Sequence, residues 1–281
     1  MDASDENADG RIVSERDGPL SVITIDRPAK LNGFTPKMMR ELARAITEYD
    51  EDRDARCALV KAEGPHFTAG LDLPKVVEAW RRGESLFPAD ALDIWDLRPP
   101  FRTKPLILAA KGICFTVGVE LMLAADIVIA AEDCRFGQLE VRRGIMASGG
   151  ATIRMVERAG WGNAMRYLLT GDEWDAETAL RFNFVQEVVP TGREFERAKE
   201  LALRIAERAA PLAVAATRAN ARVALAYGPD AGEADHRADQ RSCDRAWRDS
   251  RFVLRSHLPS RTARRRQKRW RADAQTDRKA G

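Results

Sequence analysis

Short hydrophobic segments alternate with turn-forming residues along the first half of the chain. Residues 20–26 read LSVITID, a run rich in β-branched side chains that ends at Arg27-Pro28, which is typical of a strand. Thr35-Pro36 then supplies a helix cap and a proline for the first turn, and apolar residues at positions 38, 39, 42, 43 and 46 form one face. Similar patterns predict strands at 57–62, 105–110, 127–131 and 135–137, a connection at 112–116, and helices at about 74–82 and 117–126.

A helical pattern dominates after Gly149-Gly150. We expect helices at 151–159, 162–169, 176–181, 194–209 and 212–227, interrupted by one strand-like piece at 185–189. Repeated strand–strand–helix units followed by helices predict an α/β fold with a coiled arrangement. We place a core domain at residues 11–190, a helical region at 191–232 and a tail at 233–281.

Composition indicates one substantial globular core. The chain has 281 residues, 44% of them hydrophobic, which is enough for one large domain. The first ten residues are acidic and polar, unlike a signal peptide, and the longest apolar run, 115–131, contains Glu120 and Asp126, so it is too polar to span a bilayer. We therefore expect a cytoplasmic protein with no membrane partner.

Cysteine and histidine usage argues against several kinds of site. The four cysteines are far apart and form no C-x-x-C pair, so we interpret them as reduced thiols. Only three histidines are present, two of them after residue 232. Metal sites and Ser/His/Asp triads are therefore poorly supported, and we expect no metal.

Charge is distributed unevenly along the chain. Residues 233–281 contain 15 Lys and Arg against 7 Asp and Glu, a net charge of +8, which leaves −5 for residues 1–232 out of a total of +3. The cluster at 261–271, RTARRRQKRWR, could neutralise phosphates while its tryptophan stacks on a base. A solvated extension is the simpler interpretation, because no folded nucleic-acid motif accompanies the cluster. A change of reading frame in a GC-rich gene would also produce such a rise in arginine.

Two glutamates, Glu120 and Glu140, lie 20 residues apart in apolar, small-residue surroundings. Burial of a carboxylate is costly and needs a reason. A glutamate in the first turn of a helix can simply stabilise the helix dipole, by roughly 0.3 to 1 kcal/mol. However, the glycine-containing turns at 69–72 and 116–118 could present backbone N–H groups to a developing negative oxygen. Each turn could also be an ordinary tight turn.

Four segments together resemble the crotonase superfamily, the enoyl-CoA hydratase/isomerase family. They are IDRPAKLN at 25–32, HFTAGLDL at 66–73, residues 112–126, and RFGQLEVRRG at 135–144. The resemblance covers about residues 20–227. It implies that residues 11–190 form a spiral of ββα units holding a CoA thioester, and that residues 191–232 form a helical trimerisation region.

The resemblance also implies roles for individual residues. Glu120 and Glu140 occupy the two positions that are glutamates in the hydratases, and the N–H groups of Leu71 and Val117 would form the oxyanion hole. Neighbouring residues implied in substrate binding are Ala69, Gly70, Asp72 and Gly118. The pair of acids would direct a water onto the β-carbon of a 2-enoyl-CoA while Glu140 protonates the α-carbon. Family isomerases usually keep only the second glutamate, so the presence of both favours a hydratase.

The chain departs from the family pattern in two places. Thr116-Val117-Gly118 replaces a run of three glycines, so a β-branched valine supplies the oxyanion donor, and such a residue does not easily adopt positive φ. Ala147-Ser148 replaces a Pro-Gly pair, although Gly149-Gly150 keeps the next turn flexible. His66, just before the oxyanion loop, is either a substrate contact or a polar turn residue, and we favour the turn residue.

Our prediction is an enoyl-CoA hydratase that acts as a homotrimer or a dimer of trimers on an acyl-CoA thioester, with no cofactor besides the coenzyme A of its substrate. The alternatives are a Δ3,Δ2-enoyl-CoA isomerase and a carbon–carbon bond or thioester hydrolase on the same fold, because fold alone does not determine the reaction. A nucleic-acid-binding protein using the basic tail is a further alternative.

Overall fold

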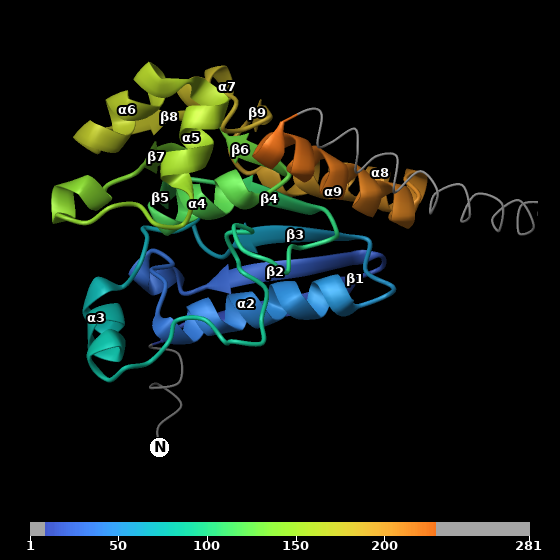
Figure 1. Cartoon of the computed structure of the whole chain (residues 1–281), viewed down its shortest axis with the longest axis horizontal. Helices are drawn as coiled ribbons and strands as arrows, with labels where there is room; N and C mark the ends of the chain where they lie inside the picture. Colours follow the sequence, from blue (N-terminus) through green and yellow to red (C-terminus); the bar gives the residue numbers. More distant parts are fainter. Residues whose placement is uncertain (1–8, 229–281) are drawn as a thin grey trace, which may run out of the picture. The chain divides into compact units, whose positions relative to one another are not determined.

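A computed structural model describes residues 9–228 of the chain (Figure 1). The chain divides into two compact units, residues up to Ala215 and residues from Ala216 onward. The first unit holds both sheets and the helices through α8, Glu194–Arg208, and α9, Pro211–Tyr227, runs across the division. The predicted tail at 233–281 and its basic cluster lie outside the described residues.

The larger sheet has six strands in the order β1-β2-β3-β4-β6-β9. Only β1 is antiparallel to its neighbour, and the other pairings are parallel. Sequence patterns missed β1 because its residues are mostly polar and exposed, as suits an edge strand. The strands are β1 Arg11–Asp17, β2 Leu20–Asp26, β3 Cys57–Ala62, β4 Leu106–Ala110, β6 Ile127–Ala131 and β9 Glu187–Val189.

The central parallel strands are mostly hydrophobic and buried because both faces of the sheet are covered. In β3, Ala58 and Val60 belong to one hydrophobic core, whereas Cys57 and Leu59 belong to the other, as the period of two requires. The first core includes one face of α2, Pro36–Glu51, and the second includes Ala198 and Ala202 of α8. Helices α2 and α8 therefore cover opposite faces of the sheet (Figure 1).

A smaller sheet joins β5, β7 and β8. The prediction that 112–116 is only a connection was wrong, because residues 113–115 pair with β7 as the strand β5. The three-residue strand β8 was not predicted either, since charged residues stand on both sides of Trp174. The strands are β5 Ile113–Phe115, β7 Arg135–Gly137 and β8 Glu173–Asp175. The remaining elements are the 3₁₀ helices η1 Pro28–Lys30 and η2 Glu140–Arg143, and the α-helices α3 Leu73–Arg81, α4 Val117–Ala124, α5 Ala151–Ala159, α6 Trp161–Thr170 and α7 Ala176–Arg181.

Local sequence signals set several helix boundaries. The Thr35 hydroxyl accepts a hydrogen bond from the Met38 N–H at 3.2 Å, which caps α2 as the Thr-Pro pair predicts. The mixed α/β fold class and the predicted α2 and α5 are thus confirmed. Helix α8, which we grouped with the helical region at 191–232, packs on the sheet, while a role in trimerisation stays a prediction. Within residues 9–228, no helix is long and apolar enough to cross a membrane.

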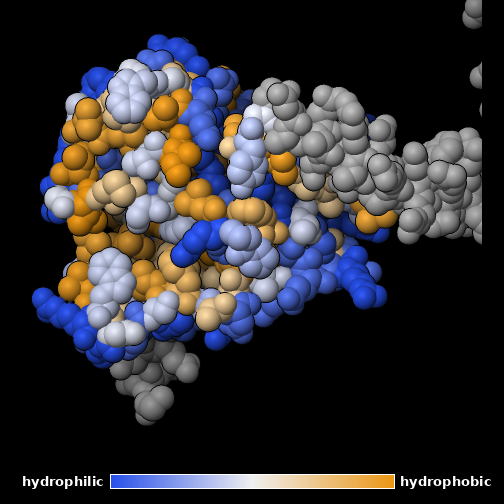
Figure 2. Space-filling view, in the orientation of Figure 1, coloured by the Kyte–Doolittle hydropathy of each residue, from blue (hydrophilic) through white to orange (hydrophobic). Residues whose placement is uncertain are grey.

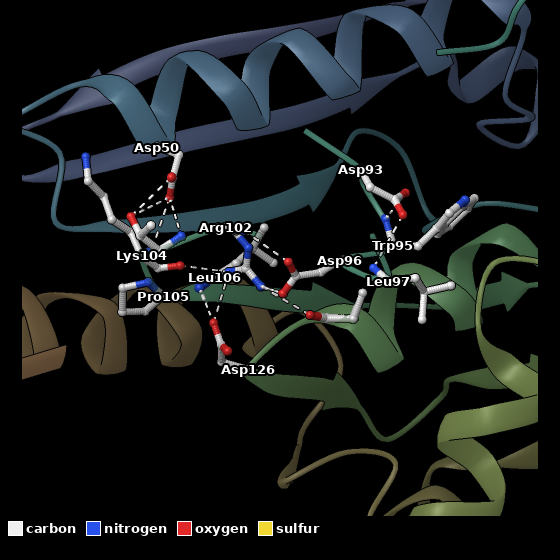
Figure 3. A network of polar contacts seen from close by, with 12 residues as sticks. Asp50, Asp93, Trp95, Asp96, Leu97, Arg102, Lys104, Pro105, Leu106 and Asp126 are labelled. Carbon is white, nitrogen blue, oxygen red and sulfur yellow. Dashed lines mark hydrogen bonds and ion pairs between the residues drawn. The ribbon is translucent and has the colours of Figure 1, made fainter. Parts of the chain in front are cut away.

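A buried arginine anchors the long connection between α3 and β4 (Figure 3). The Arg102 guanidinium donates to Asp126 Oδ2 at 3.0 Å and to the Lys104 carbonyl at 2.9 Å, and it lies 3.8 Å from Asp96. Asp93 accepts the Trp95 N–H at 3.2 Å. A buried charge is tolerated only when it is paired and hydrogen-bonded, and this network holds Trp95 in place beside the site described next.

Candidate active site

Two loops that are far apart in the sequence, residues 66–72 and 112–117, lie side by side. The Phe115 N–H donates to the Thr68 carbonyl at 3.0 Å, and Thr68 forms a parallel bridge with Cys114. Gly70 has a φ of +108°, and a Cβ there would overlap the Thr116 hydroxyl. Only glycine satisfies both the conformation and the close approach, which brings residues 69–72 against the start of α4.

Two backbone N–H groups in these loops have no partner in the described part of the chain. They belong to Leu71 and Val117, the residues that the resemblance assigns to the oxyanion hole. Val117 is the first residue of α4, where N–H groups lack intrahelical acceptors and carry the positive end of the helix dipole. Both groups are therefore available to an external acceptor.

Thr116, rather than Val117, adopts the unusual backbone conformation. Its φ is +49° and its ψ is −109°, whereas Val117 is buried at 2% exposure as part of a regular helix. Val117, a β-branched residue that does not easily adopt positive φ, therefore need not do so, since the positive φ falls one residue earlier. A β-branched residue in this region carries a strain of about 1 to 3 kcal/mol, which the packing against Gly70 maintains.

Glu120 is buried at 5% exposure, one turn into α4. Its Oε1 accepts the Gly149 N–H at 2.6 Å and, more weakly, the Ala151 N–H at 3.4 Å. Burial raises the pKa of Glu120 to about 7, and the nearby charge of Glu140 adds to the effect, while the two backbone bonds oppose it. The carboxyl group can therefore exchange a proton near neutral pH.

Gly149 is a site residue that we did not identify from the sequence. A Cβ at this position would fall 2.7 Å from Glu120 Cδ and 2.9 Å from Trp95 Cδ2. The backbone at Gly149 thus packs closely against both the Glu120 carboxylate and the Trp95 ring. We interpreted the Gly149-Gly150 pair only as a flexible turn. The feature that could have identified Gly149 is the lack of a side chain at two consecutive positions shortly after the segment that contains Glu140.

Glu140 begins the 3₁₀ helix η2 and is partly exposed to the same region. Its Oε1 lies 3.5 Å from the Gln138 side-chain nitrogen, a long contact, and its buried Oε2 has no partner among the described residues. Burial raises the pKa of this carboxyl as well. An unpaired buried oxygen is unusual, and here it is available to a molecule in the adjoining space.

A cavity of about 300 Å³ adjoins Glu140 and the Leu71 loop. Its wall includes Ala69, Leu71, Asp72, Thr116, Glu140 and Arg143. Figure 2 shows hydrophobic side chains gathered on the flank that carries α3, the η2 segment and α6, and the exposed apolar residues of these elements include Trp80, Ile145, Met146 and Trp161. The cavity wall itself combines polar residues with the apolar Leu71, Leu139 and Ile145, as small-molecule sites commonly do.

Residues of the segment 25–32 hold the loop at 66–72 in place through hydrogen bonds. The buried Arg27 guanidinium donates to the Asp72 carboxylate and to the Gly33 carbonyl, at 2.9 and 2.8 Å. The Asn32 side chain donates to the carbonyls of Glu63 and His66, at 2.8 Å each. These bonds fix both ends of the loop at residues 66–72.

The other predicted site residues have clear structural surroundings. Ala69 donates its N–H to Leu31 and lines the cavity, whereas Gly118 packs against Thr68, where a Cβ would fall 2.5 Å from Cγ2. His66 Nδ1 accepts the Ile113 N–H at 3.2 Å, which gives this histidine a structural bond in the turn. Across residues 9–228, no group of His, Cys, Asp or Glu side chains is arranged to hold a metal ion.

Sequence comparison agrees with this arrangement. A family model described as enoyl-CoA hydratase/isomerase matches residues 15–244. A probable enoyl-CoA hydratase of Mycobacterium tuberculosis is 32% identical over 202 residues, covering 72% of this chain and 77% of that protein. A carnitinyl-CoA dehydratase of Citrobacter koseri is 33% identical over 207 residues, with the same coverage of 72% and 77%.

Solved structures give the same result. A probable enoyl-CoA hydratase/isomerase from Mycobacterium abscessus superposes with a TM-score of 0.80 at 45% identity, covering 87% of this chain and 95% of that one. An enoyl-CoA hydratase from Mycobacterium tuberculosis H37Rv gives a TM-score of 0.73 at 35% identity, covering 81% and 88%. The fold is thus a crotonase-like α/β fold. The chain belongs to the enoyl-CoA hydratase/isomerase family of the crotonase superfamily.

Proposed function

We propose that the chain is an enoyl-CoA hydratase that adds water in syn geometry to the double bond of a 2-enoyl-CoA thioester, or removes it in the reverse direction. The main observation in support is the pair of carboxyls, the buried Glu120 and the partly buried Glu140, both with raised pKa, together with a cavity whose wall includes Glu140 and Leu71. Some relatives are named as hydratases and one as a carnitinyl-CoA dehydratase, names that are compatible with both the addition and the removal of water.

In this proposal the thioester oxygen accepts hydrogen bonds from the N–H groups of Leu71 and Val117. Charge accumulates on that oxygen when water attacks the β-carbon, and amides that are already oriented stabilise it without reorganisation. Loss of one such donor typically lowers the rate by about 10²- to 10³-fold. Ala69, Gly70 and Asp72 hold the Leu71 loop, and Gly118 allows α4 to approach it.

The two carboxyls divide the proton transfers between them. Hydration needs one group to accept a proton from water and another to deliver a proton to the α-carbon. We assign activation of the water to the pair, with Glu120 held by the Gly149 N–H, and delivery to carbon to Glu140, whose Oε2 has no other partner in the described structure. Burial raises the pKa of both carboxyls, to about 7 for Glu120, which suits proton transfer near neutral pH, and no cofactor besides coenzyme A in the substrate takes part.

The test is hydration of crotonyl-CoA, followed as loss of the conjugated absorbance. E120Q and E140Q should each lower kcat by at least 100-fold, while E173Q, at an exposed glutamate of β8, should retain activity. Isomerisation of a 3-enoyl-CoA needs only one base, so an isomerase would keep its activity in E120Q. Full hydratase activity in E120Q would refute the assignment. A homotrimer or dimer of trimers remains our proposal for the assembly, to be tested by light scattering.

A further inference from the structure

Arg143 is a cation on the cavity wall, one turn from Glu140. The two residues are the first and last of η2, which is a 3₁₀ helix. Residues three apart in such a helix lie on the same side, with a separation of about 6 Å along its axis. Both residues line the cavity, so a guanidinium group is presented next to the proposed acid.

No acidic side chain between residues 9 and 228 neutralises the positive charge of Arg143. Among the described residues Arg143 forms no ion pair, whereas its neighbour Arg142 binds Asp172 at 2.7 Å and the Thr170 carbonyl at 2.8 Å. The other acid on the cavity wall besides Glu140 is Asp72, which is paired with the buried Arg27. A guanidinium group offers planar, bidentate donors that match a carboxylate or a phosphate.

The position of Arg143 favours a carboxylate of the acyl group over a phosphate of coenzyme A. Glu140 must reach the α-carbon in the proposed reaction, and Arg143 lies only one 3₁₀ turn away. The nearest phosphate of coenzyme A is separated from the thioester by the whole pantetheine arm, whereas a carboxylate ending a short acyl chain lies a few bonds from the double bond. The exposed Ile145 lines the same cavity two residues after Arg143 and suits the apolar part of the acyl chain between the double bond and the carboxylate.

We infer that Arg143 is a specificity-determining residue that binds a terminal carboxylate on the acyl chain, so that the preferred substrates are 2-enoyl-CoA monothioesters of short dicarboxylic acids. This inference rests on the proposed function, because it places the double bond at Glu140. Binding of the carboxylate to Arg143 would hold the acyl chain extended past Glu140. The guanidinium group would offset the negative charge of the carboxylate.

The test compares two substrates that differ only in the terminal carboxylate, crotonyl-CoA and glutaconyl-CoA. The wild-type chain should show the higher kcat/KM with glutaconyl-CoA. R143L should lower kcat/KM for glutaconyl-CoA by about tenfold or more relative to its effect on crotonyl-CoA, because a hydrogen bond to a charged group is lost, and R143K should recover part of this. R44L, which removes an exposed arginine of α2 that does not line the cavity, should leave the substrate ratio unchanged.

Binding of unreactive saturated analogues separates this inference from the proposed function. Calorimetry with butyryl-CoA and glutaryl-CoA should show tighter binding of glutaryl-CoA by the wild type and equal binding of the two by R143L. Equal affinity in the wild type would refute the role of Arg143 while leaving the thioester site intact. An equal loss for both ligands in R143L would assign Arg143 to a phosphate instead, and absence of binding by either would refute the site itself.

Discussion

Replacing Glu120 with glutamine should abolish catalysis and yet stabilise the folded protein at alkaline pH. Burial raises the pKa of this carboxyl from 4.5 to about 7, so the folded state holds a proton that the unfolded state has lost. Stability therefore falls as the pH rises from 4.5 to 7, because the unfolded state binds fewer protons than the folded state in that interval. Glutamine is always neutral and avoids this penalty.

The size of the effect follows from the shift. Each unit of pKa difference corresponds to about 1.4 kcal/mol, so the ionised Glu120 destabilises the fold by roughly 3 kcal/mol above pH 7 and by less than about 1 kcal/mol at pH 5. The advantage of E120Q over the wild type should then grow by about 2 kcal/mol between pH 5 and pH 8. The glutamine Oε1 can still accept the Gly149 N–H, so that bond is preserved.

Urea denaturation at pH 5 and pH 8 measures this difference. E187Q serves as a control of opposite sign, because the hydrogen bond from Arg197 lowers the pKa of Glu187. An ionised group with a lowered pKa stabilises the fold at the higher pH, so E187Q should lose stability there. If the stability of E120Q relative to the wild type were the same at pH 5 and pH 8, the conclusion that Glu120 is a buried carboxyl with a raised pKa would be refuted.

Three further predictions test the geometry of the site. G149A should lower kcat at least 100-fold with little loss of secondary structure by circular dichroism, because the new Cβ would fall 2.7 Å from Glu120 Cδ; retained activity would contradict the close approach. T116G should raise the free energy of unfolding by about 1 kcal/mol, since glycine tolerates positive φ, whereas T116A should not, and a less stable T116G would show that Thr116 is unstrained. The pH profile of kcat/KM should lose activity below about pH 7, because protonated Glu120 cannot accept a proton from water; an acid limb near pH 4.5 would exclude Glu120 as that base.

Local patterns in the sequence were sufficient for most of the secondary structure. The short apolar runs at 57–62 and 105–110 and the Thr35-Pro36 cap are local features of the sequence, so they can be recognised without knowing the fold. The resemblance segments then led to the family and to the proposal that Glu120 and Glu140 share a site. The strand β5 escaped detection because it lies in a segment that we interpreted as a connection, and β8 because charged residues stand on both sides of Trp174.

The arrangement around the carboxyls was decided by tertiary structure alone. Gly149 lies 29 residues from Glu120 in the chain yet donates to its carboxylate at 2.6 Å, and Thr116 rather than Val117 takes the strained conformation because Gly70 packs against it. Arg143 joins the cavity wall because η2 is a 3₁₀ helix, whose period of three aligns it with Glu140. The sequence alone was enough to nominate the residues proposed to carry the chemistry, whereas packing between distant segments determined their burial, partners and proton affinity.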